Sequence, residues 1–207
     1  MEKKKIENLL KSFVDNPGYL LKSGWLRSME ENRAVDADGN PIPWITYPAL
    51  DFLADRVTSK MVVFEYGSGN STFWWSSRVE KLVSCEHDKE WYAAFRSRIP
   101  ENTTYLLRRA KGGSTDYVME IVKYRDMFDI LVIDGRDRVN CVRNGLASLH
   151  HDGVIVWDNS DREEYQEGFD FLEENGFKSL DFRGMGALAT RRWCTSIFYR
   201  RDNCLNI

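Results

Sequence analysis

Short apolar runs alternate with amphipathic segments along the chain from about residue 48 to its end. The first five runs are nearly continuous in apolar residues, which is typical of strands buried on both faces of a sheet. They are MVVFE at 61–65, KLVSCE at 81–86, TTYLL at 103–107, FDILVID at 128–134 and GVIVWD at 153–158. Because strands that alternate with helices form parallel sheets, the pattern predicts an α/β fold with helices on both faces.

Helical patterns fill the intervals between these strands. They lie at about 48–57, from Asn70 onward, through Trp91 and Phe95, through Tyr117 and Ile121, at 137–149 and at 161–174. Two last strands, FKSLDF at 177–182 and CTSIFYR at 194–200, have no helix between them, so we expect them to pair antiparallel. The prediction is a three-layer αβα sandwich around a seven-stranded, mostly parallel sheet with a C-terminal antiparallel hairpin.

The first 47 residues follow another pattern. Residues 2–14 predict a short amphipathic helix with four apolar residues on one face, Ile6, Leu9, Leu10 and Phe13. The next stretch contains NPG and DADGNPIP, which predict irregular chain with a turn at Asp38-Gly39. We therefore divide the chain into an N-terminal helix with an irregular segment, 1–47, and a main domain, 48–207.

Composition narrows the class of protein. The 207 residues, 43% of them hydrophobic, suffice for one well-packed domain. A formal charge of −3 argues against a general nucleic-acid binder, which would carry a basic face. No apolar run approaches the ~18–20 residues that cross a bilayer, and no signal-peptide pattern opens the chain, so we expect a cytoplasmic protein. Four widely spaced cysteines predict reduced, mostly buried thiols, not disulfides or a zinc site.

The stretch FEYGSGNSTFWW, residues 64–75, joins the first predicted strand to the next helix. Gly67 and Gly69 let the backbone turn sharply and approach a ligand closely, because no Cβ stands in the way. Asn70, Ser71 and Thr72 open the helix and present N–H groups, hydroxyls and an amide to an anion. A dinucleotide site of the GxGxxG type needs a third glycine where Thr72 stands, and a phosphate loop needs a GK[ST] that the chain lacks.

Two acids complete this turn, because Glu65 lies two residues before Gly67 and Glu86 ends the second strand. A carboxylate at that strand end can accept hydrogen bonds from both ribose hydroxyls of a nucleoside. With E-x-G-x-G, this second acid and the final hairpin, residues 48–200 resemble class I S-adenosylmethionine-dependent methyltransferases, whose fold is Rossmann-like. The resemblance implies that Glu65, Gly67 and Gly69 contact the methionine part of the cofactor and that Glu86 holds its ribose. It also implies that Ser71 or Thr72 lies near the cofactor carboxylate and that Asn70 and Asp134 join these residues in the cofactor-binding set.

A second polar group, Asp134, Asp158 and Asn159, follows the fourth and fifth strands, whose neighbouring ends bring the side chains together. The group resembles the metal site of catechol and caffeoyl-CoA type O-methyltransferases, which implies Mg²⁺ or another divalent cation on these three residues. Those enzymes have a lysine three residues after the first Asp, where this chain has Asp137. The alternative that we favour is a metal-free site with Asp134 or Asp158 as the catalytic base or as an anchor for the substrate. A third interpretation is that these residues only cap the strand and have no chemical role.

Arginines flank both strand ends, and the guanidinium group suits a carboxylate or phosphate. Arg136 and Arg138 are the candidate substrate-binding residues; Arg143, Arg183, Arg191 and Arg192 complete a set expected around one pocket. The acceptor would then carry an anionic group.

The sequence therefore predicts S-adenosylmethionine-dependent O-methylation of a small molecule or sugar, with no nucleic-acid partner and no membrane span. Two alternatives stay open: a non-catalytic module that binds a nucleoside, and an NAD(P)-dependent reductase. Trp25, Trp44 and Tyr47 either form a lid over the cofactor, as extensions in this family often do, or pack the N-terminal segment on the helices, which we favour. The pattern makes no prediction of oligomeric state.

Overall fold

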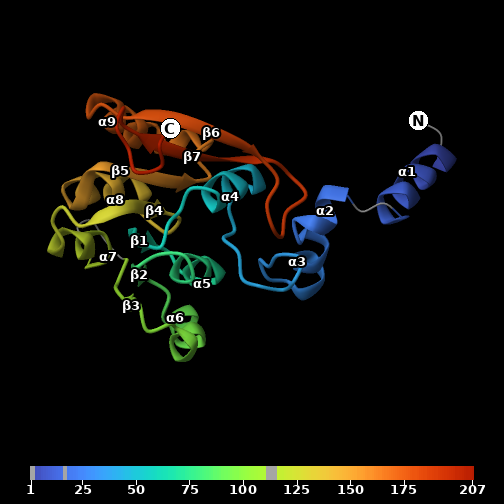
Figure 1. Ribbon diagram of the computed structural model, residues 1–207, viewed down its shortest axis with the longest axis horizontal. Coiled ribbons are helices and arrows are strands. Elements are labelled where there is room, and N and C mark those ends of the chain that lie inside the picture. Colours follow the sequence, from blue (N-terminus) through green and yellow to red (C-terminus); the bar gives the residue numbers. More distant parts are fainter. Residues whose placement is uncertain (1–2, 16–17, 111–115) are drawn as a thin grey trace.

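The structure is a computed structural model that describes residues 3–15, 18–110 and 116–207 (Figure 1). At its centre lies a seven-stranded sheet with the order β3-β2-β1-β4-β5-β7-β6. The strands are β1 Val62–Tyr66, β2 Lys81–Glu86, β3 Thr103–Leu107, β4 Phe128–Ile133, β5 Leu149–Asp158, β6 Lys178–Gly184 and β7 Trp193–Tyr199. Strands β1 to β5 run parallel, and β7 pairs antiparallel with both β5 and β6. The predicted mostly parallel sheet with a C-terminal hairpin is confirmed.

Helices cover both faces of this sheet, as the alternating pattern predicted. They are α4 Tyr47–Ala54, α5 Asn70–Ser76, α6 Lys89–Phe95, α7 Asp116–Met119, α8 Arg138–Gly145 and α9 Gln166–Glu174. Successive strand residues point to opposite faces, so each strand feeds two cores. In β1, Val63 belongs to one core with Trp74 and Trp75 of α5, while Phe64 belongs to the other with Tyr117 of α7. Both tryptophans are buried.

Element boundaries differ from the prediction where the pattern is polar. Strand β5 begins at Leu149 and not at Gly153, because the polar segment His150–Asp152 continues the extended chain past a register shift beside β4. The helix predicted to reach residue 149 ends at Gly145. A 3₁₀ turn, Leu146–Ser148, follows it. Three of the four cysteines are buried, and Cys204 is partly exposed.

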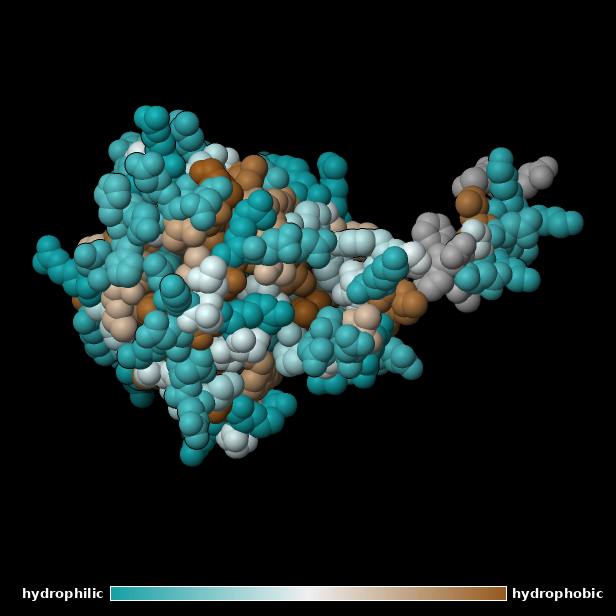
Figure 2. Space-filling model, viewed as in Figure 1, coloured by the Kyte–Doolittle hydropathy of each residue, from teal (hydrophilic) through white to brown (hydrophobic). Residues whose placement is uncertain are grey.

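The N-terminal segment is more regular than expected. Helix α1, Lys3–Asp15, confirms the amphipathic helix, and it projects from the body of the protein (Figures 1 and 2). The segment expected to be irregular contains α2, Gly18–Lys22, and α3, Trp25–Glu31. Left-handed residues bound α3, with φ of 79° at Gly24 and 50° at Asn32, so backbone geometry and not apolar periodicity defines this helix.

The predicted turn at Asp38-Gly39 is present. The carboxylate of Asp36 accepts hydrogen bonds from the backbone N–H groups of Asp38 and Asn40, and Gly39 has φ of 91°. Such a carboxylate-capped turn needs no bound ion to hold its shape.

The end of the N-terminal segment is tied to the C-terminal hairpin. The Thr46 N–H donates to Thr195 Oγ1 over 3.1 Å, and the Tyr47 N–H donates to Met185 O over 2.7 Å. Trp25 Nε1 donates to Ala189 O over 2.8 Å. These contacts hold the segment beside the loop between β6 and β7, next to the carboxyl ends of the parallel strands. Across the described residues, no helix is long and apolar enough to cross a bilayer.

Candidate functional site

The strand order reverses between β1 and β4, and a cavity of about 1040 Å³ opens there at the carboxyl ends of the strands. Ligands bind at such switch points in open α/β sheets. We call it the crevice cavity. Its lining comes mainly from the loops after β1, β2 and β4 and includes Gly67, Ser68, Glu86, His87, Trp91, Asp134, Arg136, Arg138, Arg162 and Tyr165.

The glycine turn forms one wall of the crevice cavity. Gly67 has φ of 87°, and a Cβ placed on it would lie 2.7 Å from Asp134 O, so only glycine fits this close approach. The neighbouring polar residues face elsewhere. Asn70 Nδ2 donates to Ala34 O over 2.6 Å, and the Thr72 hydroxyl accepts from the Gly69 N–H over 3.1 Å. Asn70, Ser71 and Thr72 are not among the residues that line the cavity.

Glu65 lies beneath the turn and is fully buried. Its Oε2 accepts hydrogen bonds from the hydroxyls of Thr72 and Ser84, both at 2.6 Å. Its Oε1 has no hydrogen-bond partner among the described residues. Burial raises the pKa of Glu65 to about 7, against the opposing effect of the nearby hydroxyls. This carboxyl therefore stabilises the turn from behind, and Glu65 is not among the residues that line the crevice cavity.

Glu86 faces the crevice cavity from the end of β2 and is almost fully hydrogen-bonded. Oε2 accepts from the backbone N–H and the hydroxyl of Ser68, at 3.0 and 2.7 Å. Oε1 accepts from the N–H groups of His87 and Asp88, both at 2.7 Å. A carboxylate has about four acceptor positions, so a ligand hydroxyl can bind only in exchange for one of these donors. The Ser68 hydroxyl is the donor with an alternative, because it also lies 2.8 Å from the hydroxyl of Tyr105.

Trp91 is a site residue that the sequence did not reveal. It is 48% exposed, lines the crevice cavity and donates from Nε1 to Ser68 O over 2.8 Å. Its ring also lies beside Gly69. A large exposed ring on a cavity wall offers a surface on which a base can stack. The helical pattern through Trp91 indicated a helix and gave no sign of which side of it faces a cavity.

Asp134, Asp158 and Asn159 lie together, as the strand ends predicted, and the side chain of Arg138 lies among them. Arg138 Nη2 is 3.0 Å from Asp134 Oδ1 and 3.4 Å from Asn159 Oδ1. Its Nη1 donates to the backbone carbonyl of Asp158, and its Nε donates to Gly135 O over 2.9 Å. The guanidinium is only 8% exposed. Arg138 is thus held by the protein's own groups and is not an anion-binding arginine on the surface.

Asp158 is fixed from the opposite side by β7. Its Oδ1 accepts from Trp193 Nε1 at 2.9 Å and from the Thr195 hydroxyl at 2.6 Å. Burial raises the pKa values of both Asp158 and Asp134, and the charge of Asp158 raises that of Asp134 further. The positive charge of Arg138 acts in the opposite direction on both carboxyls. The pair therefore holds protons to higher pH than ordinary carboxyl groups.

A second cavity of about 430 Å³ lies next to the C-terminal hairpin, and we call it the hairpin cavity. It is lined by Trp44, Asp134, Asp158, Asn159, Asp161, Arg162, Ala189, Arg191, Arg192 and Trp193. Three of these, Trp44, Asp134 and Arg162, also line the crevice cavity, so the two cavities meet there. The Asp134 side chain is 30% exposed at this junction.

The arginines do not all surround one pocket, so that expectation is wrong. Arg143 lies 3.3 Å from Glu167 and Arg183 lies 3.1 Å from Asp181, and neither lines the two cavities. Arg136 lines the crevice cavity, and Arg191 and Arg192 line the hairpin cavity. Arg162 follows the fifth strand and lines both cavities, which the sequence does not indicate, because only the packing of its loop turns it toward the site.

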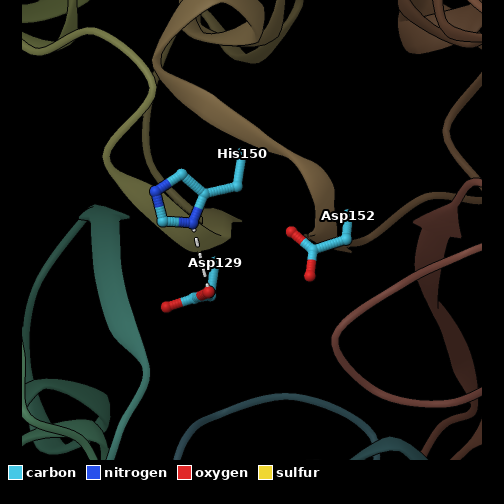
Figure 3. A group of neighbouring side chains, drawn as sticks. All are labelled: Asp129, His150 and Asp152. Atoms are coloured by element: carbon cyan, nitrogen blue, oxygen red, sulfur yellow. Dashed lines mark hydrogen bonds and ion pairs between the residues drawn. The ribbon is translucent and has the colours of Figure 1, made fainter.

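Another group of potential metal ligands lies at the opposite end of the sheet. Figure 3 shows Asp129, His150 and Asp152 pointing toward one another, and their ligand atoms lie within 4.8 Å of each other. His150 Nδ1 is 3.2 Å from Asp129 Oδ1, while Asp129 Oδ2 accepts from the Val62 N–H over 2.7 Å. His150 and His151 lie near the start of β5, at the end of the sheet opposite the two cavities. Asp129 already joins the beginnings of β1, β4 and β5, so the group has a structural role without an ion.

No protein-family model matches this chain, and no curated protein matches it. Solved structures match in fold. A methyltransferase from Geobacter sulfurreducens is 15% identical with a TM-score of 0.57, over 96% of this chain and 97% of that one. An rRNA methylase from Streptococcus thermophilus is 14% identical with a TM-score of 0.55, over 76% and 99%. A Streptococcus mutans protein solved with SAH is 15% identical with a TM-score of 0.51, over 72% and 94%.

Two spermidine synthase structures also share the fold, and the chain spans 55% and 58% of the length of those chains. At such low identities these similarities establish the fold alone. It is the fold of class I S-adenosylmethionine-dependent methyltransferases, as the glycine turn and the hairpin predicted.

Proposed function

On the basis of this fold, we propose that the protein transfers a methyl group from S-adenosylmethionine to an oxygen atom of a small acceptor that carries an anionic group. The observation that carries the proposal is the junction of two cavities at Asp134. One cavity has the position, size and glycine wall suited to a nucleoside cofactor, and the other is suited to a smaller acceptor. A group at the junction can touch both molecules.

The crevice cavity fits the cofactor on three points. Gly67 lets the backbone come close to a ligand, because it has no Cβ. Glu86 can accept the ribose hydroxyls if the Ser68 hydroxyl keeps its contact with Tyr105 and releases Oε2. Trp91 offers a ring for the base. When bound, S-adenosylmethionine supplies a methyl group on a positively charged sulfur.

The residues at the junction then align the acceptor and remove its proton. The acceptor hydroxyl gives its proton to the Asp134 carboxylate, and the oxygen forms a bond to the methyl carbon. The bond between that carbon and sulfur breaks, and its electron pair stays on sulfur, which leaves a neutral thioether. Alignment supplies most of the rate in such an in-line displacement, and a well-placed base adds to it. The raised pKa of Asp134 brings its basicity closer to that of the hydroxyl it serves.

The lining of the hairpin cavity favours an anionic acceptor. Arg191 and Arg192 have no hydrogen bond or ion pair among the described residues, so their charges are free for a ligand. A carboxylate or phosphate matches the guanidinium fork. A polyamine, the kind of molecule named in the spermidine synthases, would be repelled by these arginines. A uronic acid or a phosphorylated sugar has both the hydroxyl and the anionic group.

Calorimetry tests the cofactor half of the proposal. We expect S-adenosylmethionine and its product SAH to bind the wild-type protein, and Glu86→Ala to weaken SAH binding by about 1.5–3 kcal/mol, or about 10–150-fold. Glu80→Ala, which removes an exposed acid outside both cavities, is the matched control and should not change the affinity. Binding of NADH without binding of either sulfur ligand would refute the proposal in favour of a reductase.

Methyl transfer tests the other half. Labelled S-adenosylmethionine should transfer its methyl group to a member of a pool of hydroxylated carboxylates and sugar phosphates. Binding of SAH without transfer to any pool, including RNA, would favour the non-catalytic nucleoside module.

A further inference from the structure

We propose that the guanidinium of Arg138 takes the place of a divalent cation at the Asp134–Asp158–Asn159 group, so that methyl transfer at this site needs no metal. The inference rests on the proposed function for its catalytic consequence, but its structural half can be tested alone. It decides between a metal site and a metal-free site for these three residues.

The position of the guanidinium carries the inference. Nη2 lies between the side-chain oxygens of Asp134 and Asn159, at 3.0 and 3.4 Å. A cation bound by both oxygens would have to lie in the same place, at about 2.0–2.6 Å from each. Nη1 donates to the Asp158 carbonyl at the same strand end. The positive group therefore already contacts all three residues of the supposed ligand set.

The guanidinium cannot easily leave this position. Arg138 belongs to the first turn of α8, and its Nε donates to Gly135 O over 2.9 Å. Its side chain is 8% exposed, so swinging out would exchange buried, paired contacts for solvent and leave the buried Asp158 and the partly buried Asp134 without this counter-ion. A divalent ion added beside the fixed guanidinium would be repelled at a separation of a few ångströms.

The remaining ligand set is also poor for a metal. Asp158 Oδ1 is occupied by the Trp193 and Thr195 side chains at 2.9 and 2.6 Å. Asn159 Oδ1 accepts from Arg162 Nη2 over 2.9 Å. A hard cation needs six or more oxygen ligands, and these contacts already engage Asp158 Oδ1 and Asn159 Oδ1, two of the oxygens that would have to bind it.

Arg138 is then a positioning residue for Asp134. It holds Oδ1 of Asp134 at the junction of the cavities and leaves Oδ2 without a hydrogen bond among the described residues. An oxygen in that state can accept the proton of the acceptor hydroxyl. The fixed charge supplies what a metal would supply, which is a counter-ion for the acids at the reaction centre.

Binding of Mn²⁺, followed by electron paramagnetic resonance, tests the inference without any activity. All proteins in this test carry His150→Ala, which removes the Asp129–His150–Asp152 group as a competing site. With Arg138 present, we expect no Mn²⁺ site that depends on Asp158. With Arg138→Ala, Mn²⁺ affinity should increase at least about tenfold, since an uncompensated acid pair attracts a cation, and Asp158→Asn should abolish the gain.

Two results would overturn the inference. One is a Mn²⁺ ion on the protein with Arg138 present that is lost on Asp158→Asn. The other is a folded Arg138→Ala variant, with normal circular dichroism, that gains no Mn²⁺ affinity. If Arg138→Ala does not fold, Arg138→Lys, which keeps the charge, replaces it: this variant should stay free of Mn²⁺, and a gain of Mn²⁺ contradicts the inference.

Activity adds a second readout that a purely structural role would not change. Wild-type methyl transfer should be the same in excess EDTA, and dependence on added Mg²⁺ would contradict the inference.

The positive charge of Arg138 lowers the pKa of Asp134, so Arg138→Met should shift the acid limb of the pH–rate profile to higher pH, and Arg138→Lys should restore part of the shift. Absence of SAH binding would refute the proposed function and leave the Mn²⁺ result as the test of the inference.

Discussion

Asp134 touches both cavities, and its neighbours determine when it can act as a base. Burial and the charge of Asp158 raise its pKa, so the methyl-transfer rate should rise with pH above the range of ordinary carboxyl groups. Asp134→Asn should lower kcat about 10²–10⁴-fold while SAH affinity changes little. Asp161→Asn, a change in an exposed acid of the hairpin cavity, is the control and should keep most of kcat. Equal kcat values for the two variants would remove Asp134 from proton transfer.

Glu65 gives a prediction on stability. Its pKa is about 7 in the folded state against 4.5 for the ordinary group, so the folded state holds a proton that the unfolded state releases. The contribution of this group to the free energy of unfolding is therefore fully present below pH 4.5 and is lost as the pH rises through 7. The loss is up to about 3 kcal/mol, at about 1.4 kcal/mol for each pKa unit.

Glu65→Gln removes this titration. In urea unfolding at pH 4 to 8, the variant should gain stability relative to wild type as the pH rises, by about 1–3 kcal/mol at pH 8. If the difference in unfolding free energy between the two proteins stays constant over this range, the pKa of Glu65 is not raised by folding.

Single residues were predictable where the backbone dictates them. Gly67 must be glycine, because a Cβ there would lie 2.7 Å from Asp134 O, and the E-x-G-x-G pattern exposes that constraint. Arg138 was not predictable in its role. The sequence shows an arginine four residues after Asp134, but only the first turn of α8 brings its guanidinium back between the two strand ends.

At the scale of the elements, the N-terminal segment separates into two parts. The described side chains of α1 are exposed, whereas α3 contributes to the body of the protein. The Ser28 hydroxyl donates to Val35 O and accepts from the Val35 N–H, at 2.8 and 3.0 Å. Trp25 joins α3 to the hairpin loop.

Two truncations should therefore differ. A protein with residues 18–207 should keep the melting temperature and SAH affinity of the full chain. One with residues 33–207 should lose about 2–4 kcal/mol of stability, from several lost hydrogen bonds and the packing of Trp25, which lowers the melting temperature by several degrees. Differential scanning calorimetry measures both. Equal melting temperatures for the two truncated proteins would show that α3 is dispensable.

The central strands could be predicted nearly to the residue, because burial on both faces leaves an unbroken apolar run. The spans KLVSCE and TTYLL coincide with β2 and β3. Helices α2 and α3 could not be predicted in this way. They are only five and seven residues long, and contacts with distant residues such as Ala189 hold them.

At the scale of the whole molecule, strand alternation predicted the αβα layers, whereas the reversal of strand order between β1 and β4, where the crevice cavity opens, is seen only in the structure. The hairpin cavity could not be predicted. It forms only where Trp44, which is 50% exposed, meets the loop between β6 and β7 and the end of β5. Three segments that are far apart in sequence contribute to it, and no local pattern records their meeting.

The charge of the whole chain and the charge of this cavity have opposite implications for the acceptor. The protein carries −3 overall, so an anion meets weak repulsion at long range. Within the hairpin cavity, Arg162, Arg191 and Arg192 face Asp134, Asp158 and Asp161. The raised pKa values of Asp134 and Asp158 and the guanidinium of Arg138 reduce the negative side of this balance. The cavity should therefore attract anions at short range.

Arg191 and Arg192 are the residues with which to measure this attraction. Replacing both with Ala should raise KM for an anionic acceptor about 10–100-fold, since each charged hydrogen bond contributes about 1.5–3 kcal/mol before solvent screening reduces it. SAH affinity should stay within about twofold, because neither arginine lines the crevice cavity. Arg183→Ala, on an exposed arginine paired with Asp181, is the matched control.

Added salt should raise KM in the wild type and much less in the double variant, because salt screens exposed charges. If the double variant methylates its acceptor with the wild-type KM, groups other than these arginines hold the acceptor. The proposal of an anionic acceptor would then be wrong, and a neutral acceptor would be favoured.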